Sequence, residues 1–124
     1  MTIARLRVAA LDCPDPQALA SFYAAITGWP IRPSTSDDPE WVELVSDSGA
    51  ALAFQRVRDY SPPDWPGQHA PQQAHLDFAV SSLEEGEKAL AALGVRRHRV
   101  QPQPEEFLVF LDPAGHPFCL VIED

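Results

Sequence analysis

Cysteine, basic side chains and long apolar runs are all scarce in this 124-residue sequence. Its two cysteines, Cys13 and Cys119, have no zinc-binding or redox spacing, so we expect two free thiols rather than a disulfide. Nine basic against eighteen acidic residues give a net charge of -9, which repels phosphate backbones and anionic lipid surfaces. No run approaches the roughly 18 to 20 apolar residues of a membrane helix. Nucleic acid and membranes are therefore not expected partners.

What is present fits one globular domain. The hydrophobic fraction is 45% and the charged fraction is 22%, both ordinary for a folded chain that is long enough to bury one core. The N-terminal segment MTIARLRVAALDC contains arginines and lacks the continuous apolar core of a signal peptide. We therefore expect a single domain over residues 1–124, located in the cytoplasm.

The chain contains the same pattern twice. A strand-like run, IARLRVAALD, precedes a predicted helix, DPQALASFYAAITG, which Asp15 can cap and Gly28 can end. Later, QQAHLDFAV precedes a second predicted helix, SSLEEGEKALAALG, with Ser82 as its cap and Gly94 as its stop. Because the matching positions lie 66 or 67 residues apart, the pattern indicates an internal duplication.

Three short runs with strand character follow each predicted helix. In the first half they lie near residues 31–35, at WVELVSD and at ALAFQRV; in the second half they are VRRHRV, FLVFLD and PFCLVIE. Each half therefore has the pattern of a βαβββ module. We predict an α+β fold whose two tandem modules form a cup or open barrel from curved mixed sheets, with the helices outside. Prolines flank the first run of each half, so these two strands are expected to be short edge strands.

A proline-rich segment joins the two predicted modules. Module 1 is assigned to residues 1–57, module 2 to residues 73–124, and the linker to residues 58–72, RDYSPPDWPGQHAPQ. Long segments of this kind in compact domains are either linkers or functional loops. Two interpretations stay open for it, a solvated connector or a lid over a cleft.

Side-chain alternation predicts which residues face the inside of the cup. It places His75, Asp77 and Cys119 on the sheet face opposite to the one that must take the helix. The duplication maps Val8 onto His75 and Ala53 onto Cys119. Four equivalent inward positions therefore hold one imidazole, one thiol and two apolar side chains.

The paired modules resemble the vicinal oxygen chelate superfamily, which includes glyoxalase I, extradiol dioxygenases, fosfomycin-resistance transferases and bleomycin-binding proteins. The motifs that carry the resemblance are DPQALASFYAAITGW in one half and HLDFAVSSLEEGEKALAALG with LDPAGHPFCLV in the other. They cover nearly the whole chain, and the Trp-Pro linker, HLDF and FC are similar to a glyoxalase-like subgroup. The resemblance implies that the four inward positions hold His and Glu metal ligands in the metal-dependent members.

This sequence keeps His75 at one implied ligand position, has Cys119 where a Glu would stand, and has Val8 and Ala53 at the other two. Catalytic zinc sites usually take three protein ligands, so we expect no bound metal and no cofactor. Gln55, Glu123 or Asp77 could be recruited, but each lies about 7 Å further along its strand. If a metal did bind a His and Cys pair, zinc would be preferred.

The first hypothesis is therefore a metal-independent protein that binds an apolar or aromatic metabolite or antibiotic in the cup. The candidate ligand-binding residues are His75, Cys119, Gln55, Asp77, Trp41 and Trp65. Alternatives are a metal-dependent lyase, isomerase or dioxygenase of the glyoxalase type with a rebuilt ligand set, and a cofactor-free acid/base enzyme that uses His75. His75 could also be a hydrogen-bonded core residue, and Cys119 a small buried apolar one. No catalytic residue is assigned, and a homodimer is expected because edge strands favour being covered.

Overall fold

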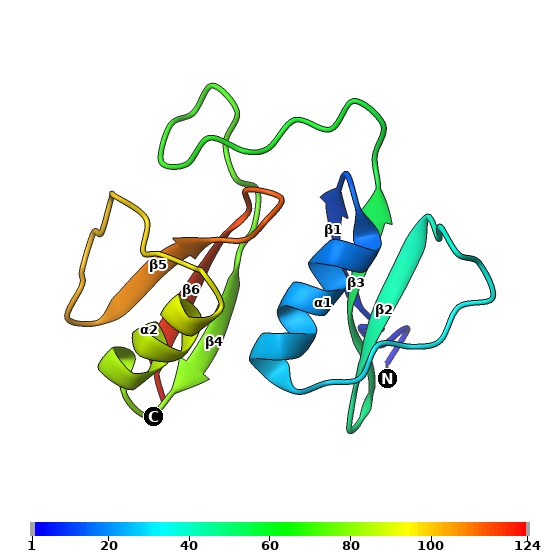
Figure 1. Ribbon diagram of the computed structural model, residues 1–124, viewed down its shortest axis with the longest axis horizontal. Coiled ribbons are helices and arrows are strands. Elements are labelled where there is room, and N and C mark those ends of the chain that lie inside the picture. Colours follow the sequence, from blue (N-terminus) through cyan, green and yellow to red (C-terminus); the bar gives the residue numbers. More distant parts are fainter. Residues whose placement is uncertain (1, 124) are drawn as a thin grey trace. The chain divides into compact units, whose positions relative to one another are not determined.

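The computed structural model describes residues 2–123 and divides into two compact units after Ser61. Each unit contains one helix and a three-stranded sheet (Figure 1). The predicted linker does not stand apart, because its residues from Pro62 onward belong to the second unit. No helix among residues 2–123 is long and apolar enough to span a membrane. The α+β class and the tandem modules are therefore confirmed.

The first unit has the element order β1 (Ala9–Cys13), α1 (Pro16–Thr27), β2 (Trp41–Ser46) and β3 (Gly49–Arg56). Its sheet has the strand order β1-β3-β2, with β1 parallel and β2 antiparallel to β3. The predicted helix signals are confirmed: Asp15 accepts a hydrogen bond from the amide of Ala18 at 3.2 Å, and Gly28 ends α1 with a φ of 74°. The Tyr23 ring of α1 stacks on Phe54 of β3 at 5.7 Å, so Phe54 marks the face that the helix covers.

The second unit repeats this order with β4 (Leu76–Val80), α2 (Leu83–Ala92), β5 (Phe107–Leu111) and β6 (Pro117–Ile122). Its strand order is β4-β6-β5, again with one parallel and one antiparallel pair. Ser82 caps α2 by accepting a hydrogen bond from the amide of Glu85 at 3.2 Å. The equal topology of the two units fits the predicted duplication.

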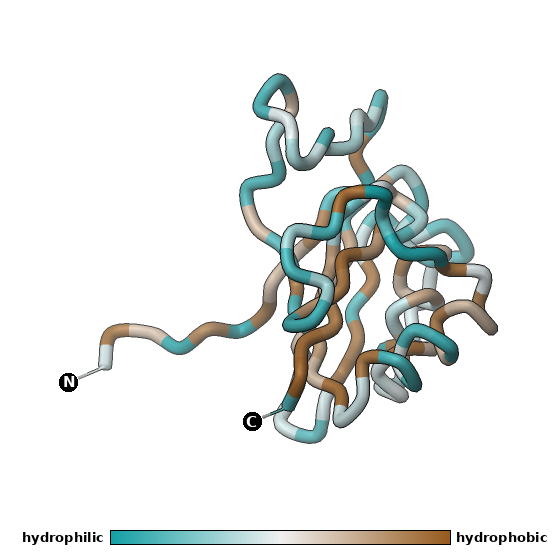
Figure 2. Tube along the Cα trace, turned by 90° about the vertical axis from the view of Figure 1, so that its left-hand side faces the viewer, coloured by the Kyte–Doolittle hydropathy of each residue, from teal (hydrophilic) through white to brown (hydrophobic). Residues whose placement is uncertain are grey.

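The helix of the second unit fixes which face of its sheet is the core. A Cβ atom added to Gly86 of α2 would lie 2.8 Å from Cδ1 of Leu120, so the helix backbone approaches β6 closely here. Phe118, two residues from Leu120, stacks on Phe110 at 5.6 Å and is fully buried. In Figure 2 the strands are mainly brown and the connecting loops mainly teal. Because side chains alternate along a strand, Cys119 between these two residues lies on the face away from α2.

Both sheets have three strands where the sequence pattern predicts four. The two expected edge strands contribute one isolated bridge each, Ile31 with Leu44 and Arg97 with Phe110. Proline lacks an amide hydrogen and cannot donate to a β-ladder, which limits pairing in these segments. The flanking prolines are Pro30, Pro33, Pro102 and Pro104. The packing of the two modules into a cup stays a prediction.

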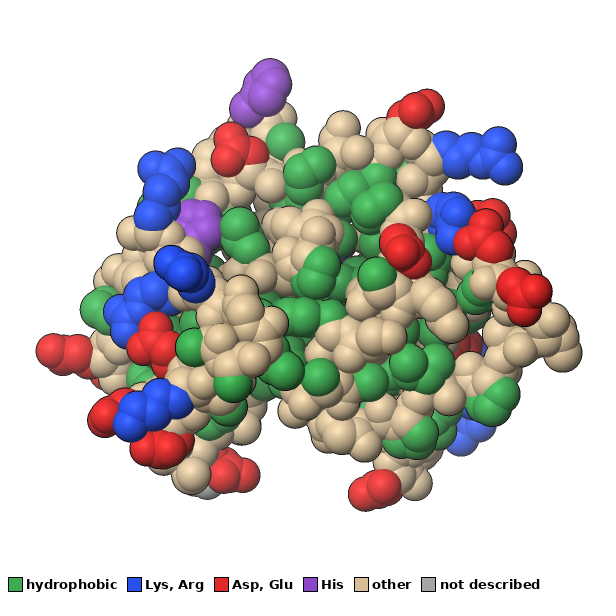
Figure 3. All heavy atoms as spheres, in the orientation of Figure 1, with side chains coloured by type: hydrophobic (Ala, Val, Ile, Leu, Met, Phe, Trp, Pro, Cys, Tyr) green, Lys and Arg blue, Asp and Glu red, His purple; other side chains and the backbone are tan. Residues whose placement is uncertain are grey.

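Charged side chains of both signs are interspersed on the second unit (Figure 3). Arg97 contacts Glu87 at 2.7 Å, and Lys88 contacts Glu84 at 3.5 Å. Exposed pairs of this kind contribute little to stability because solvent screens them.

Candidate ligand-binding site

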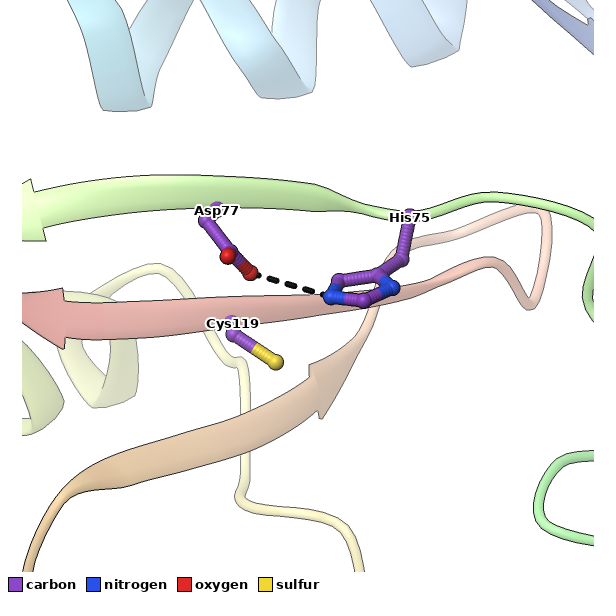
Figure 4. Close-up of side chains that lie close together, drawn as sticks. All are labelled: His75, Asp77 and Cys119. Carbon is purple, nitrogen blue, oxygen red and sulfur yellow. Dashed lines mark ion pairs between the residues drawn. The ribbon is translucent and has the colours of Figure 1, made fainter.

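Three polar side chains converge on the face of the second sheet that is turned away from α2 (Figure 4). His75 directly precedes β4, Asp77 lies in β4, and Cys119 is the register partner of Asp77 in the parallel strand β6. One donor atom from each of the three lies within 4.8 Å of the others. The expected separation of about 7 Å along the strand therefore does not keep Asp77 apart, because its side chain turns back toward His75 and Cys119.

The imidazole is oriented by the neighbouring carboxylate. His75 Nε2 lies 3.1 Å from Asp77 Oδ1, and both side chains are about half exposed. In the neutral ring Nε2 carries the hydrogen and donates to Asp77, which leaves Nδ1 as an acceptor. The pair is therefore arranged to hold a polar ligand atom or to move a proton, as the sequence hypothesis for His75 requires.

The thiol of Cys119 is buried, with 6% of the residue exposed. Burial, the negative charge of Asp77 and a hydrogen bond to Asp77 together raise the pKa of Cys119 to about 11. At neutral pH the group is a thiol that donates to the carboxylate, and it is not a thiolate nucleophile. The cysteine can contribute contact area to a ligand and can donate to Asp77.

A pocket of about 170 Å³ opens beside this cluster, within the second unit. Its walls come from the linker, β5 and β6 and the segments next to them: Trp65, Gln72, His75, Pro102, Phe107, Val109, Pro117 and Cys119. A cavity of roughly 150 Å³ holds one benzene molecule, so the volume suits a single ring. The lining is mostly apolar with a few polar groups, which is the usual character of a small-molecule site.

The linker forms a fixed wall of this pocket. The Trp65 ring meets the His98 ring edge-on at 5.2 Å, and His98 is itself held because its Nδ1 accepts a hydrogen bond from the amide of Val100. A Cβ atom on Gly115 would lie 2.8 Å from Pro62, so the start of the linker packs directly on the turn before β6. Trp65 and Gln72 therefore line the pocket, whereas Pro62, Asp64 and residues 66–69 are exposed, so both interpretations of this segment stay open.

The structure divides the six predicted site residues between the two units. His75, Asp77, Cys119 and Trp65 come together in the second unit. Gln55 and Trp41 are register partners in the first unit and do not line this pocket.

The first unit has a buried charge that the sequence analysis missed. Glu43 is 6% exposed and accepts a hydrogen bond from Trp41 Nε1 at 2.9 Å, and ion pairs join it to Arg7 and Arg32, each at 2.9 Å. The hydrogen bond from Trp41, together with the two guanidinium groups, lowers the pKa of Glu43 against the effect of burial. The signal in the sequence was a single acidic residue inside the apolar run WVELV. Since its partners already occupy the carboxylate, the cluster stabilises the sheet and does not offer a second binding site.

The metal that the superfamily resemblance implies can be tested against these donors. His75, Asp77 and Cys119 supply one nitrogen, one oxygen and one sulfur, which matches the three protein ligands of a catalytic zinc site. Zinc would act as a Lewis acid at this position. Zinc binding would displace the proton that the Cys119 thiol holds at neutral pH in the metal-free protein. Val8 and Ala53 add no donor from the first unit.

Two units of equal topology, one of them with a ring-sized pocket beside a His, Asp and Cys cluster, define a tandem-module α+β protein. Residues 8–121 match the family of glyoxalase-like domains, and the chain belongs to this family. The resemblance to the vicinal oxygen chelate superfamily is thereby confirmed.

Solved structures of similar proteins agree with this assignment. An integron cassette protein from the mobile metagenome of a Halifax Harbour sewage outfall is 25% identical with a TM-score of 0.65, over 98% of this chain and 100% of that chain. The fosfomycin resistance protein FosX of Listeria monocytogenes is 17% identical with a TM-score of 0.70, over 99% and 94% of the two chains. A lactoylglutathione lyase from Agrobacterium tumefaciens is 16% identical with a TM-score of 0.63, over 96% and 93%. No curated relative matches the chain.

Proposed function

We propose that this protein binds a small, mainly apolar or aromatic molecule, metabolite or antibiotic, in the pocket of its second unit, without a metal. The observation that carries the proposal is the pocket of about 170 Å³, whose apolar walls meet polar groups at one side. Similar structures are named for fosfomycin resistance and for lactoylglutathione lyase, and both names refer to small molecules. Binding requires no residue that this chain lacks.

Metal independence is supported by the state of the three donors. The imidazole nitrogen nearest to the cluster already faces the carboxylate at 3.1 Å, and the thiol keeps its proton at neutral pH. A second candidate function, a zinc-dependent enzyme of the glyoxalase type, is favoured by the close approach of the same three donors. The two candidates differ in one measurable quantity, the zinc content of the purified protein.

A native mass spectrum of protein purified without chelator separates these candidates. We expect no stoichiometric metal, and we expect two copies of the chain, in line with the proposed homodimer. If the protein contains one zinc per chain and the His75→Ala variant lacks it, metal-independent binding is wrong and the zinc-dependent enzyme is favoured. A single chain at micromolar concentration would contradict the homodimer.

Binding itself can be tested by titrating ring-sized probes and following amide shifts by NMR. We expect toluene, phenol or anisole to shift the amides of β5 and β6. Pro102 lines the pocket, so Pro102→Trp should fill it and abolish the shifts, whereas Pro104→Trp in the same exposed loop should leave them unchanged. If none of the three probes shifts these amides, the proposed function is wrong.

A further inference from the structure

The linker contributes to the pocket wall one residue, Gln72, whose side chain has a polar atom that the fold itself does not satisfy. Gln72 lines the pocket, and its side-chain oxygen Oε1 is buried without a hydrogen-bond partner among the described residues. Buried acceptors are nearly always bonded in folded proteins, so such an atom in a binding pocket indicates a missing donor. We propose that Gln72 selects ligands with a hydrogen-bond donor on the ring, such as a phenolic O–H or a ring N–H; this inference rests on the proposed binding function.

Most residues that line the pocket together with Gln72 have no side-chain donor to offer to it. Pro102 and Pro117 have no amide hydrogen, and Phe107 and Val109 present apolar side chains to the same pocket. The donors at the other side are directed elsewhere, since the Cys119 thiol donates to Asp77 and His75 Nε2 faces the same carboxylate. The donors of His75 and Cys119 are therefore directed to Asp77, and Gln72 Oε1 is left as an acceptor without a partner among the described residues.

The charges around the pocket narrow the ligand class further. The eight lining residues described above include no Lys or Arg, and Asp77 lies next to His75 and Cys119. A carboxylate or phosphate would lose its hydration without gaining a counter-charge, and it would be repelled by Asp77. The class that fits is a neutral, single-ring compound with one O–H or N–H group.

The wall that holds Gln72 is preorganised, which allows it to discriminate between ligands. Trp65 is packed on His98, Pro62 on the turn at Gly115, and the amide of Asp64 donates to the carbonyl of Ala70 at 2.5 Å. A ligand without a donor cannot pair with Gln72 Oε1 when it enters the pocket. Such a ligand leaves the acceptor buried and unsatisfied, a loss that corresponds to about tenfold in Kd.

Three probes of nearly equal shape test this selection. Phenol has a donor, anisole has an acceptor only, and toluene has neither. We expect phenol to bind about tenfold more tightly than anisole or toluene, although toluene is the most hydrophobic of the three. In Gln72→Leu, and in Gln72→Met as a second variant of similar size, the preference for phenol should disappear while toluene still binds.

Gln68→Leu is the matched control, because Gln68 is an exposed amide in the same linker that does not line the pocket. It should keep the preference for phenol. If toluene or anisole binds as tightly as phenol to the unmodified protein, or if Gln72→Leu keeps the preference for phenol, the proposed selection by Gln72 is wrong. Binding in the pocket would still be supported in that case. If none of the probes binds, the pocket itself is wrong.

Discussion

The raised pKa of Cys119 predicts a slow and strongly pH-dependent reaction with alkylating reagents. A cysteine of ordinary pKa, about 8.5, is about one quarter thiolate at pH 8, whereas a pKa of about 11 leaves roughly one thiol in a thousand ionised. A thiolate of higher pKa is more nucleophilic, which restores about tenfold per ionised group. The net expectation is alkylation roughly 20-fold slower than that of a free cysteine, with a further reduction from burial.

Iodoacetamide labelling followed by peptide mass spectrometry measures this rate for Cys119 separately from Cys13. The rate should rise about tenfold per pH unit from pH 7 to pH 10, whereas an ordinary cysteine levels off above about pH 9. A plateau of the Cys119 rate near pH 9 would refute the assigned pKa.

Asp77→Asn separates the causes of the shift. It removes the negative charge and weakens the hydrogen bond, so the pKa of Cys119 should fall and the labelling rate at pH 8 should increase. Burial is the largest cause and stays in place, so the pKa should remain above the ordinary value. An unchanged rate in Asp77→Asn would show that the carboxylate does not act on the thiol. Because the folded pKa is the higher one, ionisation of Cys119 should also destabilise the protein between about pH 9 and pH 11.

Two further predictions concern stability. Glu43→Gln removes the charge that Arg7 and Arg32 share; we expect a loss on the order of 1 kcal/mol in urea unfolding, and an unchanged midpoint would contradict the role of the cluster. Because the folded pKa of Glu43 is lowered, its stabilising effect should be present above its ordinary pKa and lost as pH falls below that value. Gly86→Ala should destabilise by about 1 kcal/mol net, because an overpacking cost of about 1 to 3 kcal/mol against Leu120 exceeds the gain of about 1 kcal/mol in helix propensity; greater thermal stability would contradict the close approach of α2 and β6.

The parts of the fold that depend on local chemistry could be predicted from the sequence. Asp15 and Ser82 cap the two helices as expected, and alternation placed Cys119 on the correct face of β6. These features follow from one residue and its near neighbours, so a single sequence contains enough information. The two edge strands were overestimated because the loss of a donor at each flanking proline outweighed the strand propensity.

The site was only partly predictable because it depends on contacts between distant segments. His75 and Asp77 follow from alternation, but Gln72 joins the pocket only through the packing of the linker against the second unit. No periodic pattern in a proline-rich segment indicates which side chain will be buried. Glu43 was missed for a similar reason, since Arg7 and Arg32 reach it from outside β2.

The parallel pairing of β4 with β6 has a consequence for how this protein can change over time. Asp77 and Cys119 sit opposite each other, and the adjoining pair, Leu76 and Phe118, lies on the other face. A slip of one strand by one residue would therefore turn its polar side chains toward α2 and its apolar side chains away from the core. The register of β4 and β6 is therefore tied to the core of the unit, whereas the linker side chains at the pocket, Trp65 and Gln72, can be exchanged without a change in strand pairing.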